Sequence, residues 1–270
     1  MALSKLQHKQ LLNKRQIFSL KYHDIFDYPL TALDLEKWQS RFEFNSQTQK
    51  YKNYYFLNSK KNLVSLRLQR EENSKQKLII AKKAAEVLKK IPSIKFIGIT
   101  GSLAMNNARK DSDIDFLIIT SKGLLWTTRL ISYLVLNLGG FVIRKPKDKN
   151  EKNKLCLNMW LDESDLYFDK HNLFTAHELA AIKPLINKDT TYERLILNNN
   201  WIFDYWPNAI RKPNKISKIK KIDKFVLVEY LARQIQWQYM KNKKTRELVT
   251  PTRAFFHPFD WGEHVLIKLK

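Results

Sequence analysis

The chain is poor in cysteine and in acidic residues. Its one cysteine, Cys156, excludes an internal disulfide framework and fits a reducing, cytoplasmic environment. Only 26 Asp and Glu accompany 49 Lys and Arg in 270 residues, leaving a formal net charge of +23. Such a field attracts polyanions, including nucleic acids, nucleotides and anionic membranes. The same surplus arises where lysine is simply the commonest surface residue of a proteome, and composition does not separate these two interpretations.

Several familiar signatures are missing as well. There is no zinc-ligand spacing, Walker loop or dinucleotide fingerprint, and Met1–Leu20 is too polar for a secretory leader. The longest apolar stretch, Leu124–Ile143, approaches the length of a membrane span. Arg129 interrupts this stretch and a pair of glycines breaks its end. We therefore expect no membrane span, but a helix over Leu124–Leu138 and a strand over Phe141–Arg144.

Residues with chemical potential concentrate in Phe96–Thr120. Two apolar, strand-like runs flank a turn that begins with Gly101 and Ser102, and Asp113 and Asp115 stand ten residues later at the head of the second run. Residues i and i+2 of a strand point to the same face, so the two carboxylates should lie side by side. Their mutual repulsion disfavours this arrangement unless a cation lies between them. Oxygen ligands suit a hard ion such as magnesium.

This pattern resembles the polymerase-beta-like nucleotidyltransferase superfamily. Its members carry an apolar residue, Gly-Ser or Gly-Gly, a gap of about ten residues, and then Asp-apolar-Asp-apolar. The resemblance implies an α+β fold with a mixed sheet flanked by helices, and a nucleoside triphosphate such as ATP as substrate. It assigns Asp113 and Asp115 as catalytic residues that hold Mg²⁺ or Mn²⁺, and Gly101 and Ser102 as nucleotide-binding residues. Arg109 and Lys110, between the motifs, are further candidates for phosphate contact, or are simply solvent-exposed.

Members of this superfamily usually carry a third carboxylate on a later strand. At the corresponding place, in the predicted strand Leu155–Leu161, this chain has Asn158, which offers a neutral oxygen but cannot act as a base. Asp162, Glu163 and Asp165 follow and remain alternatives if the strand register differs. The site is then either complete through one of these acids, or holds its metal with two acids and Asn158, or is an inactive remnant.

Strand alternation favours Asn158 as the third metal ligand. If the strand lies beside that of the aspartates, its leucines and Met159 face the helices. Cys156, Asn158 and Trp160 then share the face of the site. Asp162 lies four residues beyond Asn158, or about 13 Å along the strand, which is too far to share one metal ion.

The chain divides into three expected parts. Residues 1–72 resemble a winged helix: helices over Gln16–Phe26, Ala32–Ser40 and near Phe42–Lys50 precede a hairpin of Asn53–Leu57 and Leu63–Leu68. Thr31 and Asp34 match a capping box. The basic and aromatic residues of the hairpin either contact nucleic-acid phosphates or form a core with a protected edge; they are Tyr54, Tyr55, Phe56, Lys60, Lys61, Arg67 and Arg70. Residues 73–170 form the nucleotidyltransferase core, entered through a helix over Glu71–Ile91, and residues 171–270 form a helical region.

Two functions follow from these observations. The first is metal-dependent transfer of a nucleoside monophosphate to an unidentified acceptor, which the motif leaves open among RNA ends, protein hydroxyls and small molecules. The alternative is a non-catalytic nucleic-acid-binding or regulatory protein with a degenerate nucleotidyltransferase core. The absent third acid and the charge of +23 favour this alternative. The sequence leaves the oligomeric state open.

Overall fold

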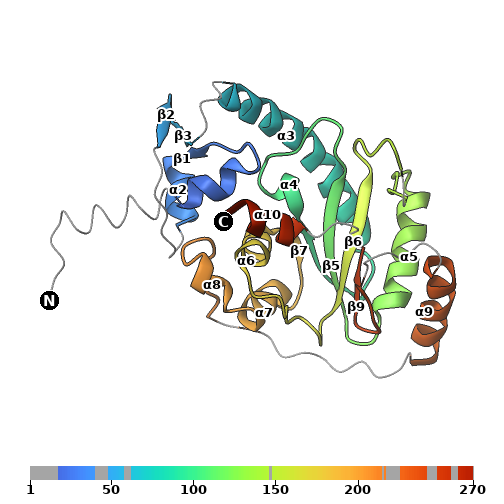
Figure 1. Ribbon diagram of the computed structural model, residues 1–270. Coiled ribbons are helices and arrows are strands. Elements are labelled where there is room, and N and C mark those ends of the chain that lie inside the picture. The colour runs from blue at the N-terminus through green and yellow to red at the C-terminus, as the bar shows by residue number, and fades with distance from the viewer. Residues whose placement is uncertain are drawn as a thin grey trace, which may run out of the picture.

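A six-stranded mixed sheet forms the centre of the computed structural model (Figure 1). The structure describes residues 18–39, 48–57, 62–145, 148–214, 216, 226–241, 248–256 and 261–269. Within these ranges the strand order of the large sheet is β7-β4-β5-β6-β9-β8, and a second, three-stranded sheet has the order β1-β3-β2. The expected α+β fold with a mixed sheet flanked by helices is confirmed.

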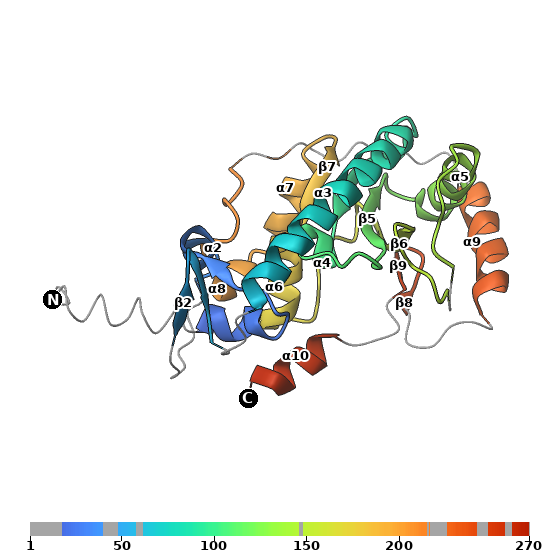
Figure 2. The same ribbon diagram turned by 90° about the horizontal axis from the view of Figure 1, so that it is seen from above.

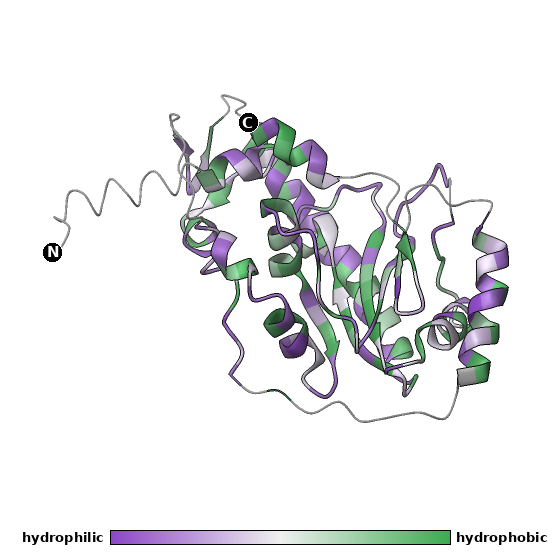
Figure 3. Cartoon of the chain, turned by 60° about the horizontal axis from the view of Figure 1, so that its bottom comes forward, coloured by the Kyte–Doolittle hydropathy of each residue, from purple (hydrophilic) through white to green (hydrophobic). Residues whose placement is uncertain are grey.

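The middle of the large sheet consists of the strands expected from the sequence. β4 (Ile94–Ile99) pairs antiparallel with β5 (Ile114–Thr120), and β5 pairs parallel with β6 (Leu155–Asp162). The apolar residues of β5 are fully buried, as in strands covered on both faces. Hydrophobic colours accordingly concentrate on the central strands in Figure 3.

Two long helices pack on each other and on these strands. α3 (Leu63–Leu88) contacts β4, and α5 (Leu125–Leu138) contacts both β5 and β6. α9 (Val226–Met240) lies along the outer side of α5 (Figures 1 and 2). It also caps α5, because the carboxylate of Glu229 accepts hydrogen bonds from the first free backbone N–H groups of that helix.

The C-terminal third contributes strands as well as helices. β7 (Lys183–Asn187) pairs antiparallel with β4, β9 (Arg253–Phe255) pairs antiparallel with β6, and β8 (Leu248–Val249) pairs with β9. These strands were not expected from the sequence. The helices of this region are α6 (Leu173–Ala181), α7 (Thr191–Asn198), α8 (Ile202–Tyr205), α9 and α10 (Trp261–Leu269). The division at residues 72/73 and 170/171 stays a prediction.

The N-terminal part contains the small sheet. Residues 18–24 are helical, and β1 (Leu30–Thr31) leads into α2 (Ala32–Lys37). The capping box is confirmed, because the Asp34 N–H donates to Thr31 Oγ1 and the Thr31 N–H donates to Asp34 Oδ2. The hairpin consists of β2 (Gln49–Tyr51) and β3 (Tyr54–Phe56). The winged-helix likeness stays a prediction, and most of its third helix lies outside the described residues.

The strand expected over Leu63–Leu68 is wrong, because these residues are the first two turns of α3. Leu63, Val64, Arg67 and Arg70 are buried at helical spacing, whereas Leu68 is half-exposed. The Arg67 guanidinium lies 3.8 Å from the Tyr28 ring centre, donates to the Pro29 carbonyl and forms ion pairs with Asp34 and Glu71. Arg67 and Arg70 are therefore occupied inside the fold, and Lys60 and Lys61 lie outside the described residues.

The apolar stretch Leu124–Ile143 forms one helix and no regular strand. Its first part forms α5, as expected, but Phe141–Arg144 is not a strand: only Ile143 makes an isolated bridge, to Leu155. The glycines that break the helix are followed by too few paired residues to form a ladder. Within the described part of the chain, no helix is long and apolar enough to cross a membrane.

A buried histidine pair joins the N-terminal part to α6. The rings of His23 and His177 approach to 3.2 Å between their Nε2 atoms, and Trp38 stacks on His177 with ring centres 4.2 Å apart. Both histidines are almost inaccessible to solvent. His177 is therefore a residue of the packed interior.

Candidate metal and nucleotide site

Three strand ends meet at one edge of the large sheet. Because β4 runs antiparallel to β5 and β5 runs parallel to β6, the carboxyl end of β4 lies beside the amino ends of the other two strands. Gly101 follows β4, Asp113 and Asp115 stand at the start of β5, and Asn158 lies near the start of β6. The fold thus collects the candidate metal ligands and the glycine turn in one place.

Gly101 allows the turn to approach the carboxylates. Its φ is +62°, a conformation that side chains disfavour, and a Cβ here would lie 3.0 Å from Asp115 Oδ2. The preceding Thr100 N–H donates to the Asp115 carbonyl at 3.1 Å, which fixes the turn against β5. Glycine is therefore required at this position by both conformation and space.

The pairing of β5 with β6 is irregular directly beside Asp115. Cys156 pairs with Asp115, and Met159 pairs with Leu117. Two residues of β6, Leu157 and Asn158, therefore stand opposite the single residue Phe116 of β5. Such bulges re-aim side chains and are common beside active sites. The Asn158 amide N–H donates to Asp115 Oδ1 at 2.7 Å, so Asn158 lies beside the aspartates, and its role as a metal ligand stays a prediction.

The same irregularity corrects one expectation. Paired residues share a face, and Trp160 pairs with Ile118, whereas Met159 pairs with Leu117 on the face of Asp115. Trp160 is therefore not on the face of the site, and it is completely buried. The extra residue in β6 reverses the alternation after Asn158.

Cys156 completes a compact group of donors. One ligand atom from each of Asp113, Asp115 and Cys156 lies within 4.8 Å of the others. Two ligands of one ion, each at about 2.0–2.6 Å, span about 4–5 Å at most, so the three atoms fit around a single cation. Burial, and next the neighbouring Asp113 carboxylate, raise the pKa of Asp115 to about 7. Burial and the two aspartates raise the pKa of the Cys156 thiol well above its usual range.

Arg144 supplies positive charge to this group. Its Nη1 lies 2.8 Å from Asp113 Oδ2 and 3.7 Å from the Cys156 sulfur, while its Nη2 pairs with Glu151 at 2.5 Å. Sequence reasoning missed Arg144, because only the path of the chain after α5 returns it to the start of β5. A basic residue at the end of an expected strand gives no signal of its own.

Lys77 of α3 holds the segment that precedes Asp113. Its buried ammonium group donates to the Ser112 carbonyl at 2.6 Å and to Asn153 Oδ1 at 2.8 Å. Burial lowers its pKa, although the charge of Asp113 acts in the opposite direction. This lysine therefore positions the entry to β5, a role that its place among the lysines of α3 does not reveal.

Comparison with known protein families agrees with this geometry. Residues 82–139 match the family model described as Polymerase beta, Nucleotidyltransferase. This segment belongs to the polymerase-beta-like nucleotidyltransferase superfamily. A search of curated proteins gave no match to the chain. The match contains Gly101, Ser102 and both aspartates, and it ends before Cys156 and Asn158 on β6.

The other residues expected in the nucleotidyltransferase site surround the turn. Ser102, Arg109 and Lys110 are exposed, on the segment between the two motifs. The helix that begins at the glycine, α4 (Gly101–Ala104), is only four residues long. The exposed groups are accessible to a bound molecule, and their roles stay predictions.

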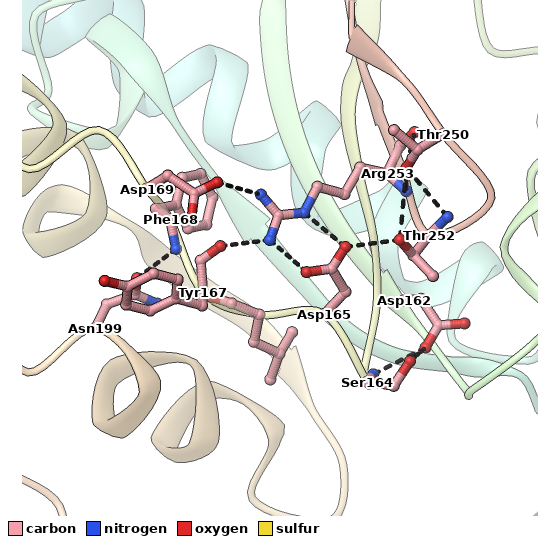
Figure 4. A network of polar contacts seen from close by, with 11 residues as sticks. Asp162, Ser164, Asp165, Tyr167, Phe168, Asp169, Asn199, Thr250, Thr252 and Arg253 are labelled. Carbon is pink, nitrogen blue, oxygen red and sulfur yellow. Dashed lines mark hydrogen bonds and ion pairs between the residues drawn. The ribbon is translucent and has the colours of Figure 1, made fainter.

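The alternative acids lie elsewhere in the nucleotidyltransferase fold. Asp162 pairs with Thr120, five residues along β5 from Asp115 or about 16 Å, and accepts hydrogen bonds from Gly123 and Ser164. Asp165 binds Arg253 and Thr252 of the β9 hairpin (Figure 4). Both carboxylates therefore stabilise the opposite end of the sheet and do not join the aspartate pair.

Proposed function

We propose that the chain is a metal-dependent nucleotidyltransferase that moves a nucleoside monophosphate from a nucleoside triphosphate to an acceptor hydroxyl. The observation that carries this proposal is the convergence of Asp113, Asp115 and the glycine turn at one sheet edge. The family match over residues 82–139 supports the reaction class.

The residues divide into two roles. Asp113 and Asp115 hold a divalent cation, Mg²⁺ or Mn²⁺ in the simplest form, and Asn158 adds a neutral oxygen. The Gly101 turn and the Ser102 hydroxyl receive the triphosphate, with Arg109 and Lys110 as further phosphate contacts. When bound, the cation lowers the pKa of the attacking hydroxyl and balances charge on the leaving pyrophosphate.

The transfer is a substitution at the α-phosphorus. The acceptor oxygen forms a bond to this phosphorus, the bond to the bridging oxygen breaks, pyrophosphate leaves and the hydroxyl proton passes to solvent. The turn positions the phosphates close to Asp115, because Gly101 leaves no side chain between them. Arg144 and Lys77 keep the start of β5 in place.

A binding experiment tests the proposal. Nucleoside triphosphate affinity is measured with and without divalent cation in the natural protein and in Asp113→Asn, with the exposed Asp111→Asn as the matched control. We expect affinity to require the cation and to fall at least about tenfold in Asp113→Asn alone. Equal affinity in all three proteins, or no effect of a chelator, would contradict the proposal.

A further inference from the structure

The candidate site contains a donor that magnesium does not favour. Cys156 is buried, stands directly opposite Asp115 in the β5–β6 ladder and points its sulfur at the two carboxylates. Magnesium takes oxygen ligands in a near-octahedral shell, whereas thiolate ligands favour zinc and related ions. The identity of this third donor therefore bears on which cation the site selects.

Asn158 provides an independent indication of a ligand. Its side chain is 5% exposed, and its amide nitrogen donates to Asp115, so the amide lies directly beside that carboxylate. Its Oδ1 is buried without a hydrogen-bond partner among the described residues. A buried acceptor without a partner is costly, and a cation at the aspartates would satisfy it.

The contact with Arg144 shows that this group of donors attracts positive charge. One guanidinium nitrogen lies close to both Asp113 and the Cys156 sulfur. The other terminal nitrogen is paired with Glu151, so the arginine has a second partner when a cation takes its place. The two carboxylates and the sulfur thus lie around one position, with the Asn158 amide beside Asp115.

We propose that Cys156 is a direct metal ligand, and that the site selects a thiophilic divalent cation of the zinc and cobalt(II) class over magnesium. This inference rests on the cation site of the proposed function and specifies the cation. The ligands are the carboxylates of Asp113 and Asp115, the Cys156 thiolate and the Asn158 amide oxygen. On binding, the thiol loses its proton to solvent and the sulfur lone pair forms the bond to the ion.

Four such donors match the mixed oxygen and sulfur coordination of zinc-class ions. The order of stability among divalent ions also places cobalt and zinc above manganese. A third carboxylate, as is usual in the superfamily, would lack this preference. The sulfur donor of Cys156 beside the carboxylate pair is therefore expected to change metal selectivity.

Cobalt(II) titration of the reduced full-length protein tests the inference directly. A cobalt–thiolate bond produces a near-ultraviolet charge-transfer absorption that oxygen ligands do not produce. Because the chain has a single cysteine, such a band can arise only from Cys156. We expect a band that saturates at one equivalent of cobalt, persists in Asp111→Asn, weakens in Asp113→Asn and disappears in Cys156→Ser.

Competition with magnesium measures the selectivity. We expect cobalt to bind at least about tenfold more tightly than magnesium, and Cys156→Asp to reduce or reverse this ratio. Circular dichroism of each variant checks its fold, and the Asp113→Asn result keeps the test decisive if Cys156→Ser does not fold.

The outcomes separate this inference from the proposed function. Cobalt binding without the band, or an unchanged metal ratio in Cys156→Asp, would overturn the role of Cys156. If Asp113-dependent nucleotide binding with magnesium persists in that case, the proposed function stands. If neither ion binds and nucleotide affinity is independent of Asp113, both proposals fail.

Discussion

Mild acid should destabilise this protein through the buried pair of His23 and His177. The Nδ1 atom of His23 lies 2.8 Å from the Ser19 carbonyl, so it carries the proton and leaves Nε2 as an acceptor. His177 must then donate from its own Nε2 across the 3.2 Å contact. Protonation of His23 at Nε2 would place two N–H groups against each other. Protonation of His177 would place a charge on a ring that is surrounded by aromatic side chains.

The size of the effect follows from the pKa values. Burial, with a smaller contribution from Lys37, lowers the pKa of His177 to about 3, and burial together with His177 lowers the pKa of His23 well below its usual value. The unfolded chain therefore binds more protons than the folded one below about pH 6.5, and stability falls as the pH decreases through this range. At about pH 5 the neutral ring of His177 costs about 2 kcal/mol, and His23 adds a loss in the same direction. Domains are typically stable by about 5–15 kcal/mol, which makes this loss substantial.

Urea unfolding at about pH 7.5 and about pH 5 measures the loss. His177→Gln preserves a donor for His23 but removes one titrating ring, and we expect it to lose about 2 kcal/mol less than the natural protein between these pH values. The exposed His171→Gln is the matched control and should behave like the natural protein. Carboxylates that titrate in the same range affect all three proteins equally and cancel. An identical pH dependence in His177→Gln and the natural protein would refute the reasoning.

Three further predictions concern other parts of the fold. Arg67→Ala should destabilise the protein by about 3 kcal/mol in urea unfolding, because it leaves buried partners uncompensated, whereas Lys75→Ala on the exposed side of α3 should change little. Gly101→Ala should lower cation affinity in calorimetry by at least about tenfold, because its Cβ would displace the nearer carboxylate; unchanged affinity would show that the turn is not part of the site. Asn158→Asp should tighten magnesium binding about tenfold by replacing a neutral oxygen with a charged one, whereas Asp162→Asn should leave it unchanged. The reverse order of these two effects would place the cation at the other end of the sheet.

The local features of the site could be predicted from the sequence. Gly101 and the aspartate pair belong to short motifs attached to apolar strands, and the position of Asn158 follows from alternation along β6. The irregularity that turns Trp160 away from the site could not be predicted, because it depends on how β6 pairs with β5 and not on the composition of either strand.

Long-range pairing explains the other differences. β7 and β9 are short and have little periodicity, and each is a strand because it finds β4 or β6 as a partner. The start of α3 resembles a strand because apolar and polar residues alternate there. Arg67 becomes buried only because the N-terminal part supplies its partners. Such residues take their structure from contacts that are distant in sequence.

The two flanking strands have a practical consequence for recombinant fragments. A fragment that ends near residue 170 would lack Lys183–Asn187 and Arg253–Phe255, and both margins of its three-stranded remainder would expose unpaired backbone groups. Exposed margins of apolar strands promote intermolecular pairing, so such a fragment should be recovered mainly in inclusion bodies. Expression of the family-matched residues alone would in addition remove β6, and with it the sulfur and amide donors. Any shortened version intended for crystallisation must therefore retain the chain through at least Phe255.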